Sequence, residues 1–304
     1  MKLVFLGTSG SIPTVKRGLP AIALKRDREL LLFDAAEGTQ RQMALAHLSP
    51  MKLDAIFITH LHGDHFLGLA GLAQTLSLMN RTRPLEIYCP AGERERVESY
   101  LRIPIYTLTF DIQVRELRPG DDLRREGYRI LTSDVDHPVP SLAYALVEDE
   151  RPGHLDPGRA AALGIKPGPD FSRLKAGQSV KLRDGRVVRP EDVIGPSRPG
   201  RKIVYAGDTR PSEHIIELAR DADVLIHDCT LADELAEKAA ESAHSTPSEA
   251  AEVAKQANVR QLVLIHVSPR YEDDDSVLLE QAKKIFPNTV VARDLMELEV
   301  ALQE

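Results

Sequence analysis

A cluster of metal-binding residue types follows a short apolar run in the first third of the chain. It comprises His60, His62, Asp64 and His65. Imidazole nitrogens and carboxylate oxygens are the ligands that zinc and similar divalent cations prefer. In extended backbone His60 and His62 point to the same side, whereas the turn at Gly63 lets Asp64 and His65 approach from a different angle. This one segment can therefore supply ligands to two metal ions.

Three more candidate ligands, His137, Asp208 and His266, follow strand-like runs farther along the chain. The carboxyl ends of strands are where α/β folds tend to place active-site residues. Taken singly, Asp208 could be a helix cap and His266 a polar strand terminus. Together with the first cluster they complete two coordination sets, in which Asp208 could bridge the two cations.

Short apolar runs alternate with runs of helical spacing, which predicts an α/β protein. The expected strands cover residues 3–6, 21–24, 30–33, 55–58, 85–88, 112–117, 128–135, 143–147, 202–206, 224–226, 262–265 and 289–292. The expected helices cover residues 37–47, 66–80, 212–220, 231–242, 247–256 and 274–286. Several strands are continuously apolar, which is typical of strands that are buried on both faces.

One segment, residues 151–200, interrupts this pattern because it is rich in Pro and Gly and poor in apolar periodicity. Residues 151–202 contain twelve Lys or Arg against five Asp or Glu, whereas residues 208–252 contain three against twelve. Such polarisation lets a chain of net charge −7 present a basic patch, although both segments could simply be solvated faces. We expect a single domain over residues 1–304 with a basic inserted arm at about 151–177.

The composition, 42% hydrophobic and 28% charged over 304 residues, is that of a globular enzyme. The two cysteines, Cys89 and Cys229, argue against a disulfide framework and favour a reducing compartment. The first residues are too briefly apolar for a signal peptide, and no run approaches the roughly 20 apolar residues of a membrane span. We therefore expect a cytoplasmic protein without a membrane partner.

The run HLHGDH at residues 60–65 resembles the signature of the metallo-β-lactamase superfamily. The resemblance implies a four-layer αββα sandwich with two Zn²⁺ ions per subunit at one edge, although other divalent ions are possible. It assigns His60, His62, His137 and Asp208 to one zinc. It assigns Asp64, His65, Asp208 and His266 to the other.

Narrower motifs are similar to those of the ribonuclease Z family. They are FLGTSGSIPT at residues 5–14, DAAEGTQ at 34–40, AGDTR at 206–210, AHST at 243–246 and HVSPRY at 266–271. The family more often has Cys-Gly where this chain has Ala35 and Ala36. The resemblance implies an endoribonuclease that removes the 3′ trailer from precursor tRNA and leaves a tRNA 3′-hydroxyl and a 5′-phosphorylated trailer. It also implies a homodimer in which the basic insertion is an arm that grips tRNA.

The same resemblance gives Asp64 the role of accepting the proton of the attacking water. His244, which otherwise could be an ordinary loop residue, becomes a candidate to bind the phosphate or protonate the leaving oxygen. Candidate phosphate contacts are Arg159, Lys166, Arg173 and Lys175 on the arm and Arg81 and Arg83 after the first helix that follows the metal motif. With no Trp and 5% aromatic residues, recognition by RNA shape and backbone is expected.

Two other functions remain open at this point. One keeps the fold but acts on a small phosphodiester, a thioester, a β-lactam or a cyclic nucleotide; the basic insertion and the AHST motif count against it. The other is an RNA-binding protein whose metals are only structural. The large ligand set weighs against that reading, because structural zinc sites are usually closed, single and often rich in cysteine.

Overall fold

The computed structural model describes residues 1–303, and the chain divides into two compact units. Unit 1 comprises Met1–Val147 and Lys202–Ala301. Unit 2 comprises Glu148–Arg201 together with the described residues after Ala301. All seven predicted metal ligands belong to unit 1.

Unit 1 contains two seven-stranded sheets, in the orders β16-β1-β2-β3-β4-β5-β6 and β15-β14-β13-β12-β9-β8-β7. The first is built from β1 (Lys2–Gly7), β2 (Ala21–Arg26), β3 (Glu29–Phe33), β4 (Leu53–Phe57), β5 (Leu85–Pro90), β6 (Ile112–Leu117) and β16 (Glu297–Glu299). The second is built from β7 (Asp122–Arg125), β8 (Tyr128–Ser133), β9 (Ala143–Glu148), β12 (Lys202–Tyr205), β13 (Val224–Asp228), β14 (Gln261–Ile265) and β15 (Thr289–Val291). Strands β3 to β6 are parallel, as are β12 to β15, so in each sheet their carboxyl ends share one edge.

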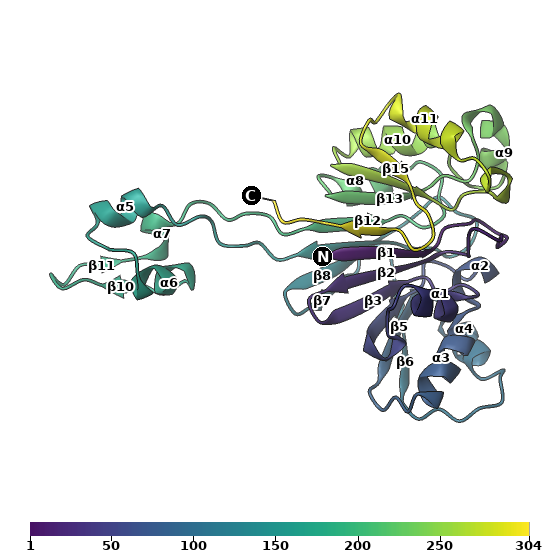
Figure 1. Cartoon of the computed structure of the whole chain (residues 1–304), viewed down its shortest axis with the longest axis horizontal. Helices are drawn as coiled ribbons and strands as arrows, with labels where there is room; N and C mark the ends of the chain where they lie inside the picture. Colours follow the sequence, from purple (N-terminus) through teal and green to yellow (C-terminus); the bar gives the residue numbers. More distant parts are fainter. Residues whose placement is uncertain (304) are drawn as a thin grey trace. The chain divides into compact units, whose positions relative to one another are not determined.

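The two sheets pack face to face over one apolar core, to which Phe57, Tyr144 and Tyr205 contribute. Helices cover both outer faces (Figure 1). They are α1 (Thr39–Leu45), α2 (Gly63–Phe66), α3 (Leu69–Leu78) and α4 (Arg94–Leu101) with the first sheet, and α8 (Glu213–Ala219), α9 (Ala236–Glu241), α10 (Pro247–Gln256) and α11 (Ser276–Lys283) with the second. Single 3₁₀ turns occur at Pro50–Lys52, Asp233–Leu235 and Pro269–Tyr271. The predicted α/β class and four-layer αββα sandwich are confirmed.

Some elements differ from those expected. The helix expected over residues 66–80 is interrupted between α2 and α3, because Gly68 donates its N–H to the Ala35 carbonyl at 2.8 Å. A Cβ at Gly68 would lie 1.9 Å from the Ala36 carbonyl oxygen, so only glycine permits this close approach. Helix α4 and the edge strands β7 and β16 were not predicted. Their segments are mostly polar, and α4 buries only Val97 and Leu101, which leaves little periodic signal.

Unit 2 is a small folded body and not a long irregular loop. It contains α5 (Pro157–Ala162), α6 (Pro169–Lys175), α7 (Pro190–Val193) and a hairpin of β10 (Val180–Lys181) and β11 (Val187–Val188). Its own apolar core consists of Leu155, Ala160, Ile165, Leu174, Val180, Val188 and Val193. Each helix begins with a proline, which suits the first helical position. The unit extends beyond the expected 151–177, because core residues continue to Val193 with irregular spacing that no periodic pattern reveals.

The helices and the two cysteines bear on the expected surroundings of the protein. Within residues 1–303, no helix combines the length and the hydropathy needed to cross a bilayer. Cys89 and Cys229 are both buried and unpaired, and burial raises the pKa of the Cys89 thiol to about 12. Both thiols are therefore protonated and unreactive at neutral pH.

Candidate metal centre

Seven side chains converge at the edge where the parallel strands of both sheets end. His60 and His62 follow β4, and Asp64 and His65 lie in the short helix α2. The other three, His137, Asp208 and His266, follow β8, β12 and β14. Their ligand atoms form two groups within which all atoms lie within 4.8 Å of one another: His60, His62 and His137, and Asp64, His65, Asp208 and His266.

The first group is made of imidazole nitrogens. His62 Nδ1 lies 3.0 Å from His60 Nε2 and 3.2 Å from His137 Nε2. Asp208 Oδ2 lies 3.8 Å from His60 Nε2. Metal–nitrogen bonds of about 2.0–2.1 Å in a tetrahedral site separate neighbouring ligand atoms by about 3.4 Å, close to these values. Burial lowers the pKa of both His60 and His137, which favours the neutral form that binds metal.

The second group surrounds the same carboxylate. Asp208 Oδ2 lies 3.3 Å from both His65 Nε2 and His266 Nε2. Asp64 Oδ2 lies 3.3 Å from His266 Nε2 and 3.7 Å from His65 Nε2. Asp208 thus faces both groups, in the position of a shared ligand. Burial alone would raise the pKa of Asp208, but the nearby His266 and His65 outweigh it and lower the pKa.

Two buried atoms in the second group, His65 Nε2 and Asp208 Oδ1, have no hydrogen-bond partner within residues 1–303. An unpaired buried polar atom normally costs about 1–3 kcal/mol, so two together in one cluster need an explanation. A divalent cation provides one, because it is bound by neutral imidazole nitrogens and carboxylate oxygens. The residues present therefore fit a metal.

Outer hydrogen bonds fix the orientation of the ligands. Asp34 Oδ2 accepts a hydrogen bond from His65 Nδ1 at 2.8 Å, which directs Nε2 toward Asp208. Asp34 is fully buried and also accepts hydrogen bonds from the Thr59 N–H and the Tyr205 hydroxyl. Thr230 Oγ1 contacts His266 Nδ1 at 2.8 Å. Such outer partners set the tautomer and angle of metal-binding histidines.

His244 lies beside the cluster, with its ring stacked on that of His266 at a centroid distance of 4.9 Å. Its Nδ1 is 2.8 Å from Asp228 Oδ2. Burial would lower the pKa of His244, but the Asp228 carboxylate outweighs burial and raises it to about 9. His244 also belongs to a third group of potential ligands with Asp208, Asp228 and His266. Asp228 thus engages Nδ1 of the imidazole and leaves Nε2 as its other ring nitrogen.

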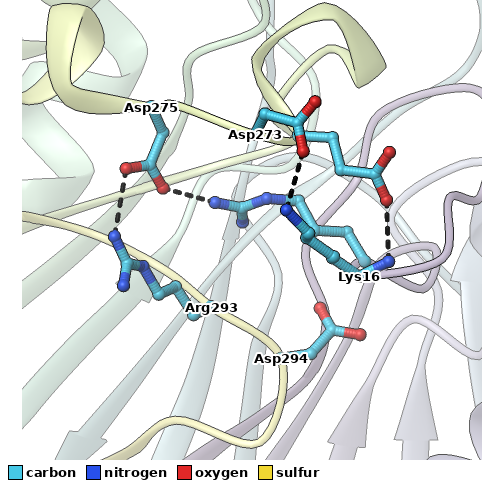
Figure 2. A pocket seen from close by; sticks show the side chains of 7 residues that line it. Lys16, Asp273, Asp275, Arg293 and Asp294 are labelled. Atoms are coloured by element: carbon cyan, nitrogen blue, oxygen red, sulfur yellow. Dashed lines mark hydrogen bonds and ion pairs between the residues drawn. The ribbon is translucent and has the colours of Figure 1, made fainter.

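The segment between β1 and β2 also contacts the second group. The Ser11 N–H donates to Asp64 Oδ2 at 2.8 Å, and the Gly10 N–H donates to the Val267 carbonyl at 3.0 Å. Below this contact, Arg17 is buried and donates to Thr8, to the Ala292 carbonyl and to Asp275. Figure 2 shows Asp275 beside Arg293, and the contact distance of that pair is 3.2 Å. Lys16 forms a separate, exposed pair with Asp273.

The six residues predicted to contact RNA lie in different surroundings, and the buried position of Arg81 corrects the expectation of an exposed contact. Arg81 is 1% exposed, and its guanidinium donates to the carbonyls of Arg83, Met51, Leu53 and Pro84. Leu53 begins β4, so Arg81 lies at the opposite end of that strand from His60 and holds backbone in place. Arg83 lies at the same end and pairs with Asp54, so it too is far from the metal edge. The four arm residues, Arg159, Lys166, Arg173 and Lys175, are exposed in unit 2.

Reasoning from the sequence missed the residues that orient the ligands. Asp34 entered only as part of a motif, and Asp228, Thr230, Arg17 and Ser11 were not singled out. Asp34 and Asp228 did carry a signal, because each is an acidic residue at the carboxyl end of an apolar strand. Ser11 acts through its backbone N–H, and a backbone group cannot be recognised from the type of residue.

The chain is similar to known proteins over its whole length. The sequence profile of the Beta-lactamase superfamily domain matches residues 178–267, and that of Anti-Pycsar protein Apyc1 matches residues 1–117. Ribonuclease Z of Methanosarcina acetivorans is 51% identical over 99% of this chain and 98% of its own length. Ribonuclease Z of Archaeoglobus fulgidus is 47% identical over 100% and 99%. The crystal structure of human tRNase Z, short form, matches with a TM-score of 0.73 at 29% identity and covers 99% of this chain and 100% of that one.

Proposed function

We propose that this chain, which belongs to the ribonuclease Z family, removes the 3′ trailer of precursor tRNA in a single hydrolytic cut. Membership of the family makes it a metal-dependent endoribonuclease of tRNA 3′-end processing. The products would be a tRNA 3′-hydroxyl and a 5′-phosphorylated trailer. The observation that carries the proposal is the convergence of seven candidate ligand side chains from four segments on two adjacent groups of donor atoms.

We propose two Zn²⁺ ions as the resident metals. His60, His62, His137 and Asp208 would hold one, and Asp64, His65, Asp208 and His266 the other, with Asp208 shared. The ligand set, rich in imidazole, favours zinc over magnesium or calcium, which prefer oxygen. When bound, such a pair supplies Lewis-acid stabilisation of the charge that grows on the phosphoryl oxygens.

The chain's own residues move the protons. Asp64 accepts a proton from the attacking water while the Ser11 N–H holds its carboxylate in place. The water oxygen bonds to phosphorus as the bond from phosphorus to the 3′ oxygen breaks. His244 then donates its Nε2 proton to that leaving oxygen, since Asp228 stabilises the protonated imidazole. Atoms and charge balance without a further reactant.

Unit 2 supports an RNA-binding role. Its loop over residues 164–169 and its β10–β11 hairpin line a cavity of about 630 Å³ that carries Lys166, Lys181, Arg183 and Arg186. Of these, Arg186 pairs with Asp184 in the same hairpin. We propose that Lys166, Lys181 and Arg183 contact tRNA phosphates, with Arg159, Arg173 and Lys175 near them in sequence as weaker candidates. Arg159 and Arg173 lie within 3.5 Å of the carboxylates of Asp156 and Asp170, which reduces their free charge.

We also propose a homodimer and a cytoplasmic location. Leu78 and Met79 are exposed at the end of α3, and Ile103 and Ile105 are exposed in the segment after α4. That segment reaches α3 where the Thr109 N–H contacts Ser77 Oγ. Large exposed apolar side chains in neighbouring segments favour a protein contact. The reducing cytoplasm suits the unpaired cysteines. Sedimentation of the Ile105→Asp variant at half the wild-type mass would support the dimer, and an unchanged mass would contradict this interface.

The test uses metal-loaded protein, a 3′-extended precursor tRNA and the Asp64→Ala variant, with the metal content of both proteins measured. We expect one cut at the tRNA 3′ end by the wild type and none by the variant. A hydrolase of small phosphodiesters with the same fold is the second candidate. Intact RNA with rapid turnover of bis-p-nitrophenyl phosphate would favour that candidate, and tight RNA binding without either cleavage would favour a binding protein.

A further inference from the structure

Arg210 contacts two parts of the segment that carries His244. Its guanidinium donates to the His244 carbonyl oxygen at 2.7 Å. The same Nη1 and the neighbouring Nη2 donate to both carboxylate oxygens of Glu249, at 2.8 and 2.5 Å. Glu249 lies in the first turn of α10 and also accepts the Thr246 N–H at 2.9 Å. One guanidinium thus joins the chain before α10 to the helix itself.

The backbone of Arg210 extends this connection to a second ligand loop. Its N–H donates to the Asp136 carbonyl at 3.1 Å, directly before His137. Thr209 Oγ1 in turn accepts the Asp136 N–H at 3.1 Å. Since Asp208 lies two residues before Arg210, the loops that carry Asp208, His137 and His244 all meet at this residue.

The His244 segment has a conformation that needs support from outside. Ala243 has a φ of +57°, which is uncommon for a residue with a Cβ. Such backbone persists only where surrounding contacts fix it. Asp228 contacts the His244 imidazole and also accepts the Ser245 N–H of the following peptide at 3.3 Å. The Arg210 guanidinium contacts the carbonyl side of that same peptide and so adds a second point of attachment.

We propose that the Arg210–Glu249 pair is a positioning device that sets His244 against the metal cluster. Arg210 is a positioning residue, since its guanidinium contacts Glu249 and the His244 carbonyl and acts through the His244 peptide. The inference rests on the proposed function of His244 as proton donor. The planar guanidinium is required because it reaches both oxygens of Glu249 and the carbonyl at once, which a lysine ammonium does not.

The test is a double-mutant cycle on precursor tRNA cleavage with Arg210→Ala, His244→Ala and the double variant. We expect Arg210→Ala to lower kcat about 10- to 100-fold with KM and metal content unchanged, as a misplaced catalytic group would. In the His244→Ala background the same change should cost almost nothing, because residues that act as a unit are not additive. Arg220→Ala, at the exposed end of α8, is the matched control and should keep wild-type kcat.

A fall in kcat that is equally large with and without His244 would overturn the proposal, as would unchanged kcat in Arg210→Ala. Glu249→Gln keeps the cap of α10 and should give a smaller loss in kcat, which guards against failure of the alanine variant to fold. Amide hydrogen exchange over residues 243–249 provides a readout independent of activity. If the wild-type protein does not cut RNA, the proposed function fails. The hydrogen-exchange measurement then decides by itself whether the pair holds the segment: faster exchange in Arg210→Ala than in the wild type supports this, and equal exchange contradicts it.

Discussion

At the scale of single residues, the buried carboxylate of Asp34 receives hydrogen bonds from three other residues. His65, Thr59 and Tyr205 all donate to it inside a fully buried pocket. Asp34 has a φ of +57°, which is unusual for a residue with a Cβ. Strained backbone angles of this kind cluster at functional sites. The physical role of this residue is to fix which nitrogen of His65 faces Asp208 and the candidate metal site.

The Asp34→Asn variant tests that role. An amide offers one acceptor oxygen and presents N–H groups to other donors, so His65 would lose its fixed orientation. We expect metal affinity and activity to fall about 10- to 100-fold. Metal content by mass spectrometry, under competition with a chelator, measures the effect. Asp122→Asn, an exposed carboxylate, should leave the metal content unchanged, and equal metal retention in both variants would contradict the role assigned to Asp34.

Gly10→Ala tests the packing around His266. A Cβ at Gly10 would lie 2.6 Å from His266 Nδ1 and 2.9 Å from its carbonyl oxygen, which no real contact allows. His266 itself has a φ of +64°, so its backbone has little freedom to move away. We expect weak metal binding and little RNA cleavage. Gly71→Ala is the control, because its nearest neighbour would lie at 3.4 Å in ordinary contact, and loss of activity there would argue for a general effect of added methyl groups.

At the scale of elements, the β1–β2 segment is held by one buried ion pair and one exposed pair. The side chains of Arg17 and Asp275 are 5% and 11% exposed, whereas those of Lys16 and Asp273 are 57% and 92% exposed. Desolvation makes the first pair strongly dependent on both partners, and solvent screens the second. The anchor of the Ser11 contact with Asp64 is therefore Arg17.

Urea denaturation of Arg17→Ala and Lys16→Ala measures this difference. Removing Arg17 leaves Asp275 buried beside Arg293 alone, and we expect the free energy of unfolding to fall by about 3 kcal/mol. Removing Lys16 should leave the free energy of unfolding almost unchanged, because solvent screens its pair with Asp273. Equal effects from the two substitutions would show that the segment is held by its backbone contacts and not by the buried pair.

At the scale of the whole molecule, the two units have separate apolar cores. Residues 157–175 supply Ala160, Ile165 and Leu174 to the core of unit 2 and nothing to the cores of unit 1. Deleting this stretch should therefore raise KM for precursor tRNA strongly while turnover of bis-p-nitrophenyl phosphate and metal content stay unchanged. Equal loss of both activities would mean that the segment supports the metal centre.

The basic side chains of unit 2 allow a less disruptive test of whether this unit binds the tRNA. Replacing Lys166, Lys181 and Arg183 by Ala should weaken tRNA binding and reduce its salt dependence by about one unit of slope for each lost phosphate contact. Affinity measured by filter binding across a salt series gives that slope. An unchanged slope would place the RNA contacts elsewhere on the protein.

The residues of this chain by themselves indicated the α/β class, most buried strands and the candidate metal ligands. The candidate ligands directly follow or lie near apolar strands, and the pattern of such a strand is local in the sequence. Only the tertiary structure decided the contacts between residues that lie far apart in the sequence. Tyr205 and Asp34 meet across 171 residues, Arg210 meets Glu249 across 39, and Arg81 turns inward to bind carbonyls instead of RNA. The compact fold of unit 2 likewise comes from apolar residues with irregular spacing. Such contacts depend on packing between elements, and packing leaves no period in the sequence.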